Sequence, residues 1–503
     1  MTKQNRLSWF LVIVPVLLLA LGIRLHEMNG RSLWFDEAIE YNVAARPLAE
    51  IIAADRSSTH DPPLYSLALG VWLQTGRTDL QVRFLSVCAS VLAVAITFVL
   101  GRRIYSTRAG WFSALLLAVA PRAVYYGFEL NQYAFVLLLS ALNLLVVERY
   151  LQRPTLRHLL VFLITSIASV LTHYELTIYL LALVVVATFS LVLRQARETR
   201  VRVIIQWLAG LGVIALVGSV LLWSYALPQK SRLPESRVPV RFNAPISVSY
   251  EVRTWLTETD QLLRVLLWGP DLPPISWLAI ALLMSGIVVS LWHASSRRLA
   301  LYFLASLAFA YGAAGIGFFV YSFTLHRNVV YAIPLAALLI SGGVFTLAAG
   351  RFRRYLTPAA YLVMVIVTVL LASRLPSISG KAFPETEQFG EVMDYFLPRY
   401  QAGDGIYVYY GAQPAFTRYA DESILKAATI QIWSRNVAPE VQISRMWQAL
   451  GRKPRVWLLM AHVHPSDRSV LPDALRARCQ LIDQFEVQSE AAYLVSCADT
   501  GQQ

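Results

Sequence analysis

Two adjacent carboxylates in an aromatic motif are the clearest candidates for chemistry in this 503-residue chain. Asp36 and Glu37 stand in Ser32-Leu-Trp-Phe-Asp-Glu-Ala38, shortly after the first long apolar run. A carboxylate can act as a general base toward a hydroxyl group. Neighbouring residues of a helix point about 100° apart, so we expect only one of the two acids to face a given cavity. The alternative is a solvated pair that begins an amphipathic segment, residues 37–52, with Asp36 as its N-cap.

A second polar group precedes an expected helix in Thr59-His-Asp-Pro-Pro-Leu-Tyr65. The two prolines favour an extended approach to that helix. If this loop folds back, His60 would share a cavity with Asp36, and Asp61 and Tyr65 are candidate substrate contacts. Asp61 could instead cap the helix, with a proline in its first turn.

Ionisable side chains also fall at the ends of later apolar runs. Charges at membrane depth are costly, and they tend to be functional or paired. The stretch Pro121-Arg-Ala-Val-Tyr-Tyr-Gly-Phe-Glu129-Leu-Asn-Gln-Tyr133 contributes Arg122, Glu129 and Tyr133 as candidates. The alternative is an Arg122–Glu129 pair that fixes a helix hairpin.

Two further positions could contact a substrate. His173 lies in His173-Tyr-Glu175 at the end of another apolar run, and the alternative there is a polar loop. Arg327 opens a later run in Leu325-His-Arg-Asn328. The planar guanidinium of arginine suits a phosphate group, whereas the alternative for Arg327 is interfacial snorkelling.

Eleven apolar runs approach the length of a transmembrane helix, which needs about 20 mostly apolar residues. The first is expected to be an uncleaved anchor, because Arg24-Leu-His-Glu27 follows it instead of a small-residue cleavage site. Short arginine-rich loops alternate with other loops, two of them long (24–81 and 226–273), as the positive-inside rule requires. We therefore expect a cytoplasmic N-terminus, and an odd number of spans places the C-terminal region outside. The expected spans are 7–23, 82–100, 109–125, 133–150, 158–173, 175–193, 203–225, 274–292, 299–320, 328–348 and 356–373.

The distribution of charge argues against nucleic-acid binding. The formal net charge is +13. From Arg374 onward, however, 13 Lys and Arg residues are balanced by 14 Asp and Glu residues. The basic excess therefore belongs to the membrane part, much of it in short loops, where it is a topology signal. The sequence also contains no Walker or dinucleotide glycine motif, so we expect neither a nucleic-acid partner nor a nucleotide site.

The expected fold is a polytopic α-helical membrane protein of about eleven transmembrane helices, residues 1–375, followed by a small extracytoplasmic α/β domain, residues 376–503. Its last two strands should form a hairpin centred on Gln488, which places Cys479 opposite Cys497. A disulfide is expected there, since an oxidising exterior permits it, and the alternative is two reduced thiols. The helices of this domain are expected at 389–397 and 471–478, and its strands at 405–410, 455–460, 480–487 and 491–497.

Taken in order, these motifs resemble the C-type glycosyltransferase superfamily, in particular protein O-mannosyltransferases and the aminoarabinose transferases of lipid A. The resemblance covers about residues 7–375. The chain departs from it at Asn131 and Asn328, where the family often has Arg and Tyr, and this leaves the substrate open. The shared features are an acidic motif after the first helix (34–37), a Pro-Pro-Leu-Tyr segment (60–65), a Tyr-Tyr-x-x-Glu-x-x-x-Tyr stretch (125–133) and a later helix that begins with Arg327 and contains Pro334.

The resemblance implies inverting transfer of a sugar from a polyprenyl-phosphate donor to an acceptor hydroxyl at the outer face of the plasma (inner) membrane. Asp36 would be the base, Arg327 would stabilise the departing lipid phosphate, and the acceptor would be a glycan, a lipid or a protein. A divalent metal such as Mg or Mn is optional, with Asp36, Glu37 and Glu129 as oxygen ligands. The alternatives are a transporter or flippase of a lipid-linked substrate and a non-catalytic member of the same fold.

Overall fold

The chain folds into two compact units, of which the first contains Met1–Met28, Leu48–Trp72 and Arg83–Ala382, and the second contains Asn29–Pro47, Leu73–Val82 and Phe383–Gln503. Two segments of the first long loop thus join the predicted C-terminal domain in one unit, although they are far from it in sequence. The computed structural model describes residues 3–59, 61–194, 197–230, 273–315, 329–349, 353–375, 387–431, 439–451, 453–464 and 467–497.

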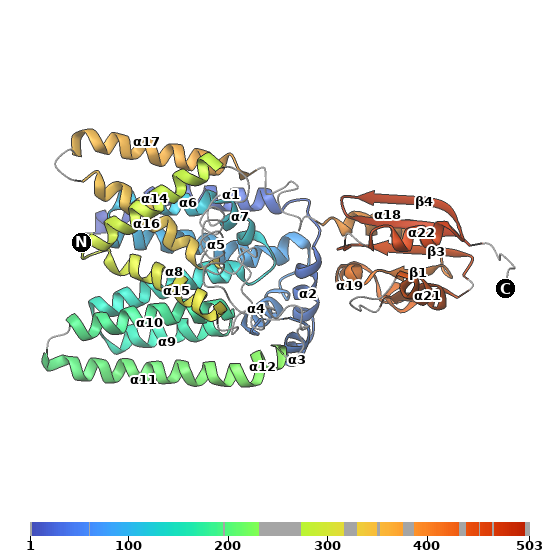
Figure 1. The fold of residues 1–503 in the computed structure, drawn as a ribbon, viewed down its shortest axis with the longest axis horizontal. Helices are drawn as coiled ribbons and strands as arrows, with labels where there is room; N and C mark the ends of the chain where they lie inside the picture. Colours follow the sequence, from blue (N-terminus) through green and yellow to red (C-terminus); the bar gives the residue numbers. More distant parts are fainter. Residues whose placement is uncertain are drawn as a thin grey trace, which may run out of the picture. The chain divides into compact units, whose positions relative to one another are not determined.

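Each of the eleven predicted apolar runs contains a helix (Figure 1). An apolar segment in lipid has no water to bond its backbone amides and carbonyls. An α-helix satisfies these groups within the segment itself. The helices in these runs are α1 (Lys3–Met28), α5 (Asp79–Ile104), α6 (Thr107–Val119), α7 (Pro121–Phe128), α8 (Tyr133–Gln152), α9 (Leu156–Val170), α10 (Tyr174–Arg194), α11 (Arg197–Leu221), α14 (Pro273–Trp292), α15 (Arg297–Gly315), α16 (Ala332–Leu347) and α17 (Arg353–Ala372). Other helices of this unit are α3 (Leu48–Ser58), α4 (Leu64–Trp72) and α12 (Leu227–Lys230), the last joined to α11 by a π-helical turn.

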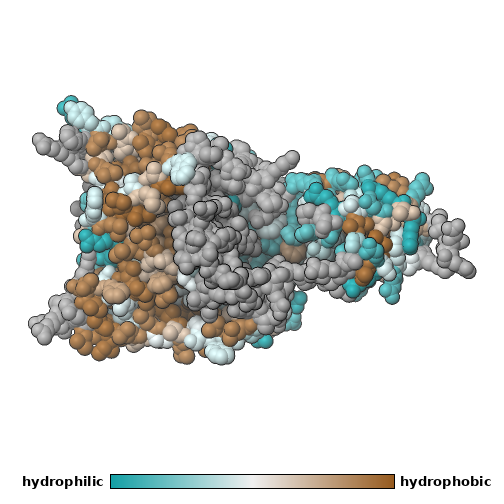
Figure 2. Space-filling view, viewed as in Figure 1, coloured by the Kyte–Doolittle hydropathy of each residue, from teal (hydrophilic) through white to brown (hydrophobic). Residues whose placement is uncertain are grey.

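The first unit has the surface of an integral membrane protein. Among the described residues, five helices are long and apolar enough to cross a membrane, or six if the bent pair α6–α7 is one span. Figure 2 shows apolar side chains over much of the visible surface of these helices. Such a surface is stable against lipid but not against water. On α11 the exposed large apolar side chains are Val201, Ile205, Leu208, Val213, Leu216 and Val220.

One expected span, 109–125, is broken into α6 and α7, which meet at 62°. Pro121 has no amide hydrogen and begins α7, so the helical hydrogen bonds cannot continue through it. The guanidinium of Arg24 closes the break by donating to the carbonyl oxygens of Ala118 at 3.1 Å and Ala123 at 3.2 Å. Arg24 is fully buried in α1, whereas the sequence analysis placed it at the start of a loop.

A buried ion pair joins α8 to α15. Arg298 Nε donates to Glu148 Oε1 at 2.7 Å, and Arg298 Nη2 donates to the other carboxylate oxygen. The hydroxyl of Tyr302 donates to Glu148 Oε1 at 3.0 Å. The charge of Arg298, at the start of α15, is thus neutralised by a partner from another helix.

The second unit is built on a five-stranded sheet with the order β2-β1-β3-β5-β4. Strands β1, β2 and β3 run parallel, and β5 is antiparallel to both β3 and β4. The sequence analysis missed β2 and three of the helices, α19 to α21. The strands are β1 (Gly405–Val408), β2 (Ala428–Ile430), β3 (Arg455–Met460), β4 (Gln480–Val487) and β5 (Glu490–Ser496). The helices are α2 (Phe35–Ala44), α18 (Phe389–Phe396), α19 (Gln413–Tyr419), α20 (Glu422–Ala427), α21 (Pro439–Leu450) and α22 (Val470–Arg476).

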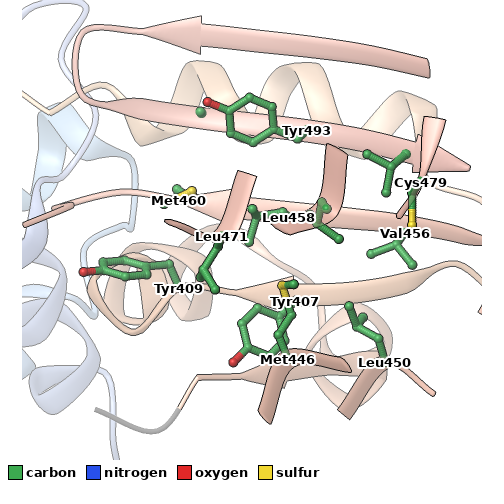
Figure 3. Packing of buried hydrophobic residues seen from close by; sticks show 13 residues of the cluster. Tyr407, Tyr409, Met446, Leu450, Val456, Leu458, Met460, Leu471, Cys479 and Tyr493 are labelled. Atoms are coloured by element: carbon green, nitrogen blue, oxygen red, sulfur yellow. The ribbon is translucent and has the colours of Figure 1, made fainter. Parts of the chain in front are cut away.

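Helices cover both faces of the central strands. Val456, Leu458 and Met460 of β3 belong to a buried cluster with side chains of α21 and α22 (Figure 3). Trp457 points to the opposite face, since successive strand residues alternate. Its indole meets the Phe396 ring of α18 edge to face, with ring centroids 5.1 Å apart. Burial on both faces explains why β3 is apolar almost throughout.

The β4–β5 hairpin turns at Gln488-Ser489, so the prediction that it is centred on Gln488 alone is wrong. A one-residue bulge at Ile482 shifts the register in the opposite sense. The two differences cancel at the open end of the hairpin. Cys479 and Cys497 therefore lie opposite each other, with their Cα atoms 4.3 Å apart, and are joined by a disulfide.

Candidate functional site

The two adjacent acids of the aromatic motif have different environments. Helix α2 begins at Phe35 with Trp34 as its N-cap, so the alternative in which Asp36 is the N-cap is wrong. Glu37 is buried, and its Oε2 accepts a hydrogen bond from the Trp34 amide at 3.3 Å, as in the carboxylate half of a capping box. Asp36 is partly exposed at the second position of the helix, where the helix dipole favours a negative charge. Glu37 thus serves the helix, while Asp36 is accessible.

Side chains of the C-terminal segment bind the backbone just before Asp36. The amide of Phe35 donates to Glu387 Oε2 at 2.9 Å. The amide of Leu33 donates to the hydroxyl of Tyr419 at 2.7 Å. These two bonds satisfy amides near a helix start that have no partner within the helix.

His462 completes this contact. Its Nδ1 lies 2.6 Å from Glu387 Oε1, and its ring stacks on Phe35 with centroids 4.4 Å apart and planes 14° apart. The backbone of His462 has φ of +51°, a left-handed conformation that costs a residue with a side chain and tends to occur at functional positions. Glu387 therefore contacts the amide of Phe35 directly and the ring of Phe35 through His462. Phe35 is the residue before Asp36.

A second buried carboxylate lies behind this group. Glu490 is 1% exposed, and its Oε2 accepts from the Gln388 amide at 2.8 Å. Burial raises the pKa of Glu490 to about 7, and the nearby charges of Glu387 and Glu391 act in the same direction. The Gln388 side chain in turn accepts from Ser32 Oγ at 3.2 Å. Glu490 thus supports the residues that hold the acidic motif.

In the first unit, Asp61 is the centre of a separate polar group. Its Oδ1 lies 3.2 Å from His173 Nε2, and its other oxygen accepts from the side-chain amide of Gln132. Its carbonyl oxygen accepts from Gln229 Nε2 at 3.2 Å. Helix α4 begins three residues later, at Leu64, so the alternative in which Asp61 caps that helix is wrong.

Asp55, which the sequence analysis did not select, lies beside this group. Its carboxylate accepts from Ser66 Oγ at 2.6 Å, from Thr59 Oγ1 at 3.1 Å and from the hydroxyl of Tyr225 at 2.8 Å. Burial raises the pKa of Asp55, although these hydrogen bonds oppose the increase. Three donors on one buried carboxylate indicate a structural role that links α3, α4 and the π-helical turn after α11.

The remaining predicted contacts of the first unit are buried near Asp61 or on adjoining helices. Tyr133 lies 5.7 Å from His173 between ring centroids. Tyr65 places its hydroxyl oxygen 3.4 Å from Ser86 Oγ. Glu129 and Arg122 are 2% and 7% exposed, and both belong to the α7 region that the break at Pro121 bends. His60 and Arg327 lie outside the described residues.

The structure groups the predicted site residues into two sets. Asp36 and Glu37 belong to the second unit, whereas Asp61, Glu129 and His173 belong to the first. A cavity or a metal ion shared by Asp36 and Glu129 stays a prediction. Within the described parts of the chain, no three His, Cys, Asp or Glu side chains are grouped as a metal site.

Glu387, Tyr419 and His462 were missed because the sequence analysis carried no site into the C-terminal domain. One signal was available. His462 lies two residues after the end of β3, at the carboxyl end of a parallel strand, where α/β proteins place functional side chains. Glu387 carries no comparable signal, since its role depends on a contact with a residue 352 positions away.

Comparison with known protein families finds a match to part of the chain. Residues 60–223 match the family model described as dolichyl-phosphate-mannose-protein mannosyltransferase. No curated protein matches the chain significantly. The matched region contains the predicted contacts from His60 to His173 but not the acidic motif at Asp36.

Solved structures extend the similarity to nearly the whole chain. ArnT from Cupriavidus metallidurans bound to undecaprenyl phosphate aligns with a TM-score of 0.55 and 14% identity over 98% of this chain and 99% of that one. The archaeal oligosaccharyltransferase AglB from Archaeoglobus fulgidus, in complex with an inhibitory peptide and a dolichol-phosphate, aligns with a TM-score of 0.51 and 12% identity over 100% and 75%. A complex of the same enzyme with Zn and sulfate gives 0.50 and 13% over 96% and 72%.

At these identities the similarity establishes the fold, which is that of the C-type glycosyltransferases. The resemblance inferred from four short motifs is confirmed. The family match and the fold agree with the prediction of a membrane glycosyltransferase.

Proposed function

We propose that this protein transfers a sugar from a polyprenyl-phosphate donor to an acceptor hydroxyl, with inversion at the anomeric carbon. Asp36 removes the proton of the acceptor hydroxyl, and the resulting oxygen attacks the anomeric carbon. The bond between that carbon and the phosphate oxygen breaks, and polyprenyl phosphate leaves. The observation that carries this proposal is the different environment of the two acids. Glu37 caps α2, whereas Asp36 is partly exposed.

The local structure suits a base at Asp36. The residue lies in the first turn of a helix whose entry is fixed by hydrogen bonds to Leu33 and Phe35. A catalytic group held on a rigid element loses little entropy when the substrate arrives. Adjacent Glu37 cannot replace it, because its carboxylate is buried against the helix entry.

Arg327 is proposed to bind the phosphate of the donor, a role taken from the family resemblance. A guanidinium stabilises the negative charge that grows on the leaving phosphate. Arg327→Lys keeps the charge but loses the planar fork, so we expect weaker donor use with Lys and a larger loss with Ala. Normal binding and use of the donor by both variants would leave Arg327 as a snorkelling residue only.

A divalent metal would supply charge stabilisation for the same leaving phosphate. Asp36 and Glu129 offer the oxygen ligands that Mg or Mn prefers. Glu37 is a poor candidate, since its carboxylate already binds the Trp34 amide. Turnover measured with chelator and with added Mg or Mn decides whether the reaction needs a metal.

The test of the proposed function is turnover by purified protein in nanodiscs. A panel of undecaprenyl-phosphate mannose, glucose and aminoarabinose serves as donors, and release of undecaprenyl phosphate is measured with glycan, lipid and peptide acceptors. Asp36→Asn is expected to lower turnover by about 10²–10⁴-fold, the usual contribution of a general base. Glu37→Gln is the matched control, because glutamine also completes a capping box, and it should lose less than about threefold. Turnover by Asp36→Asn within tenfold of the wild type would exclude the role of Asp36.

We also propose that the N-terminus is cytoplasmic and that the second unit lies on the outer face of the inner membrane. The alternating arginine-rich loops support this orientation. Reporter fusions after Arg103, Arg200 or Arg354 should read as cytoplasmic, and a fusion after Gly380 should read as external. A cytoplasmic reading after Gly380 would contradict the eleven-span topology.

A further inference from the structure

In the second unit, a segment that precedes α18 and a segment that follows β3 both contact the acidic motif. Three of the four backbone amides from Ser32 to Phe35 donate to side chains of the C-terminal segment: Ser32 to Gln388 at 3.4 Å, Leu33 to Tyr419 at 2.7 Å, and Phe35 to Glu387 at 2.9 Å. The motif and its partners are more than 350 positions apart in sequence.

The far part of α2 is anchored to the same segment. The side-chain amide of Asn42 donates to the carbonyl oxygen of Pro414 at 2.8 Å. The guanidinium of Arg418 lies 4.3 Å from the centre of the Tyr41 ring and forms an ion pair with Asp79 at 3.0 Å. A helix of ten residues is thus fixed at its entry and along its length, although so short a helix is marginal by itself.

Glu387 contacts Phe35, the residue before Asp36. Its side chain is 4% exposed, and its two oxygens have separate partners, the Phe35 amide and His462 Nδ1. His462 adopts its left-handed backbone conformation where its ring stacks on Phe35. The cost of that conformation must be offset by the contacts it permits. Two of these contacts are the stacking on Phe35, the residue before Asp36, and the bond to Glu387, which itself binds the Phe35 amide.

We propose that Glu387, together with His462, is a positioning residue that fixes the Phe35–Asp36 backbone so that the Asp36 carboxylate is aligned for proton abstraction. This inference rests on the proposed function of Asp36 as the base. Loss of the Phe35–Glu387 hydrogen bond lets the first turn of α2 move. A displacement of about 1 Å at a reacting group can cost about 10²-fold in rate.

The first test does not depend on activity. Hydrogen exchange of peptides that cover residues 31–44 is measured in the full-length wild type, Glu387→Ala and Asp404→Ala. Asp404 is the matched control, because it is also a buried carboxylate of this unit, but it binds Trp457 Nε1 at 3.0 Å at the other end of the strands. Exchange in the peptide should accelerate in Glu387→Ala and stay at the wild-type rate in Asp404→Ala. Unchanged exchange in Glu387→Ala overturns the inference.

The second test is kinetic and uses the donor of highest turnover from the panel above. Glu387→Ala should lower kcat at least tenfold with KM for the donor within about twofold, because the base is displaced while the donor contacts remain. Asp404→Ala should lower Tm but leave kcat within threefold. Glu387→Gln should recover most of kcat, since its carbonyl oxygen accepts from Phe35 and its amide donates to His462 Nδ1 in the other tautomer. A Gln variant as slow as the Ala variant would assign Glu387 a proton-transfer role and overturn the positioning role.

A double variant separates the proposed role of Asp36 as the base from the positioning role of Glu387. If Glu387 acts through Asp36, then Glu387→Ala has no further effect on the residual rate of Asp36→Asn. Wild-type turnover by Asp36→Asn refutes the proposed function, and this inference with it. A slow Asp36→Asn variant combined with a normal Glu387→Ala variant refutes the inference alone.

Discussion

Glu490 should make the second unit less stable as the pH rises through neutrality. Its carboxyl group is 1% exposed, and burial raises its pKa from 4.5 to about 7. The folded chain then binds this proton more tightly than the unfolded chain does. The stabilisation is complete below about pH 4.5 and is lost as the pH rises through about 7.

The magnitude follows from the difference between the two pKa values. One pKa unit corresponds to about 1.4 kcal/mol, so the wild type should lose on the order of 2–3 kcal/mol of unfolding free energy between pH 5 and pH 8. Glu490→Gln keeps the acceptor for the Gln388 amide but has no charge to bury. The variant should match the wild type near pH 5 and exceed it near pH 8 by about 5–10 °C in Tm.

The assay is thermal unfolding of full-length protein in detergent at several pH values between 5 and 8. Glu440→Gln is the control for the loss of one negative charge, because Glu440 is an exposed residue of α21 in the same unit. The Tm of this control should change with pH by the same amount as the Tm of the wild type. If the Glu490→Gln and wild-type curves are also parallel, the carboxyl group of Glu490 does not titrate in this range, and the argument from burial is wrong.

Two further perturbations test the packing of each unit. The disulfide Cys479–Cys497 closes a loop with a sequence separation of 18, so its reduction should cost about 3 kcal/mol in the chain-entropy model; mass spectrometry that finds both cysteines alkylated without reductant would contradict the bond. Glu148→Ala leaves the Arg298 charge buried without its carboxylate and should cost about 3–5 kcal/mol, whereas Glu148→Leu combined with Arg298→Met should recover much of the Tm; equal losses in the two variants would argue against the ion pair.

Periodicity and apolar content were sufficient to predict a helix in each of the eleven apolar runs and four of the five strands. Apolar runs of membrane length have few other ways to bond their backbone, and β3 was predicted over its full range, 455–460. The break within the expected span 109–125 was not predicted, although Pro121 marks its position in the sequence. Its support by Arg24 from α1 is a tertiary contact, which no local pattern records.

Local sequence was also enough to select two acids as candidate site residues. Asp36 was selected as one of two adjacent acids in an aromatic motif, and Asp61 as part of a polar group before an expected helix. His173, which contacts Asp61, was also selected. Gln132, which binds Asp61, and Glu387, which binds the amide next to Asp36, were not, because they are ordinary polar residues in their local sequence. The alternative in which Asp61 caps α4 is wrong, because α4 begins at Leu64 and the Asp61 carboxylate contacts His173 and Gln132 instead.

The sequence by itself determined the membrane class, the positions of the apolar helices and the order of the motifs, because each follows from local composition and spacing. Only the tertiary structure decided which of two adjacent acids is accessible. Asp36 and Glu37 have the same charge and nearly the same place in the chain. They differ because Glu37 turns back to the Trp34 amide, while Glu387 and Tyr419, from the other end of the chain, hold the backbone that orients Asp36.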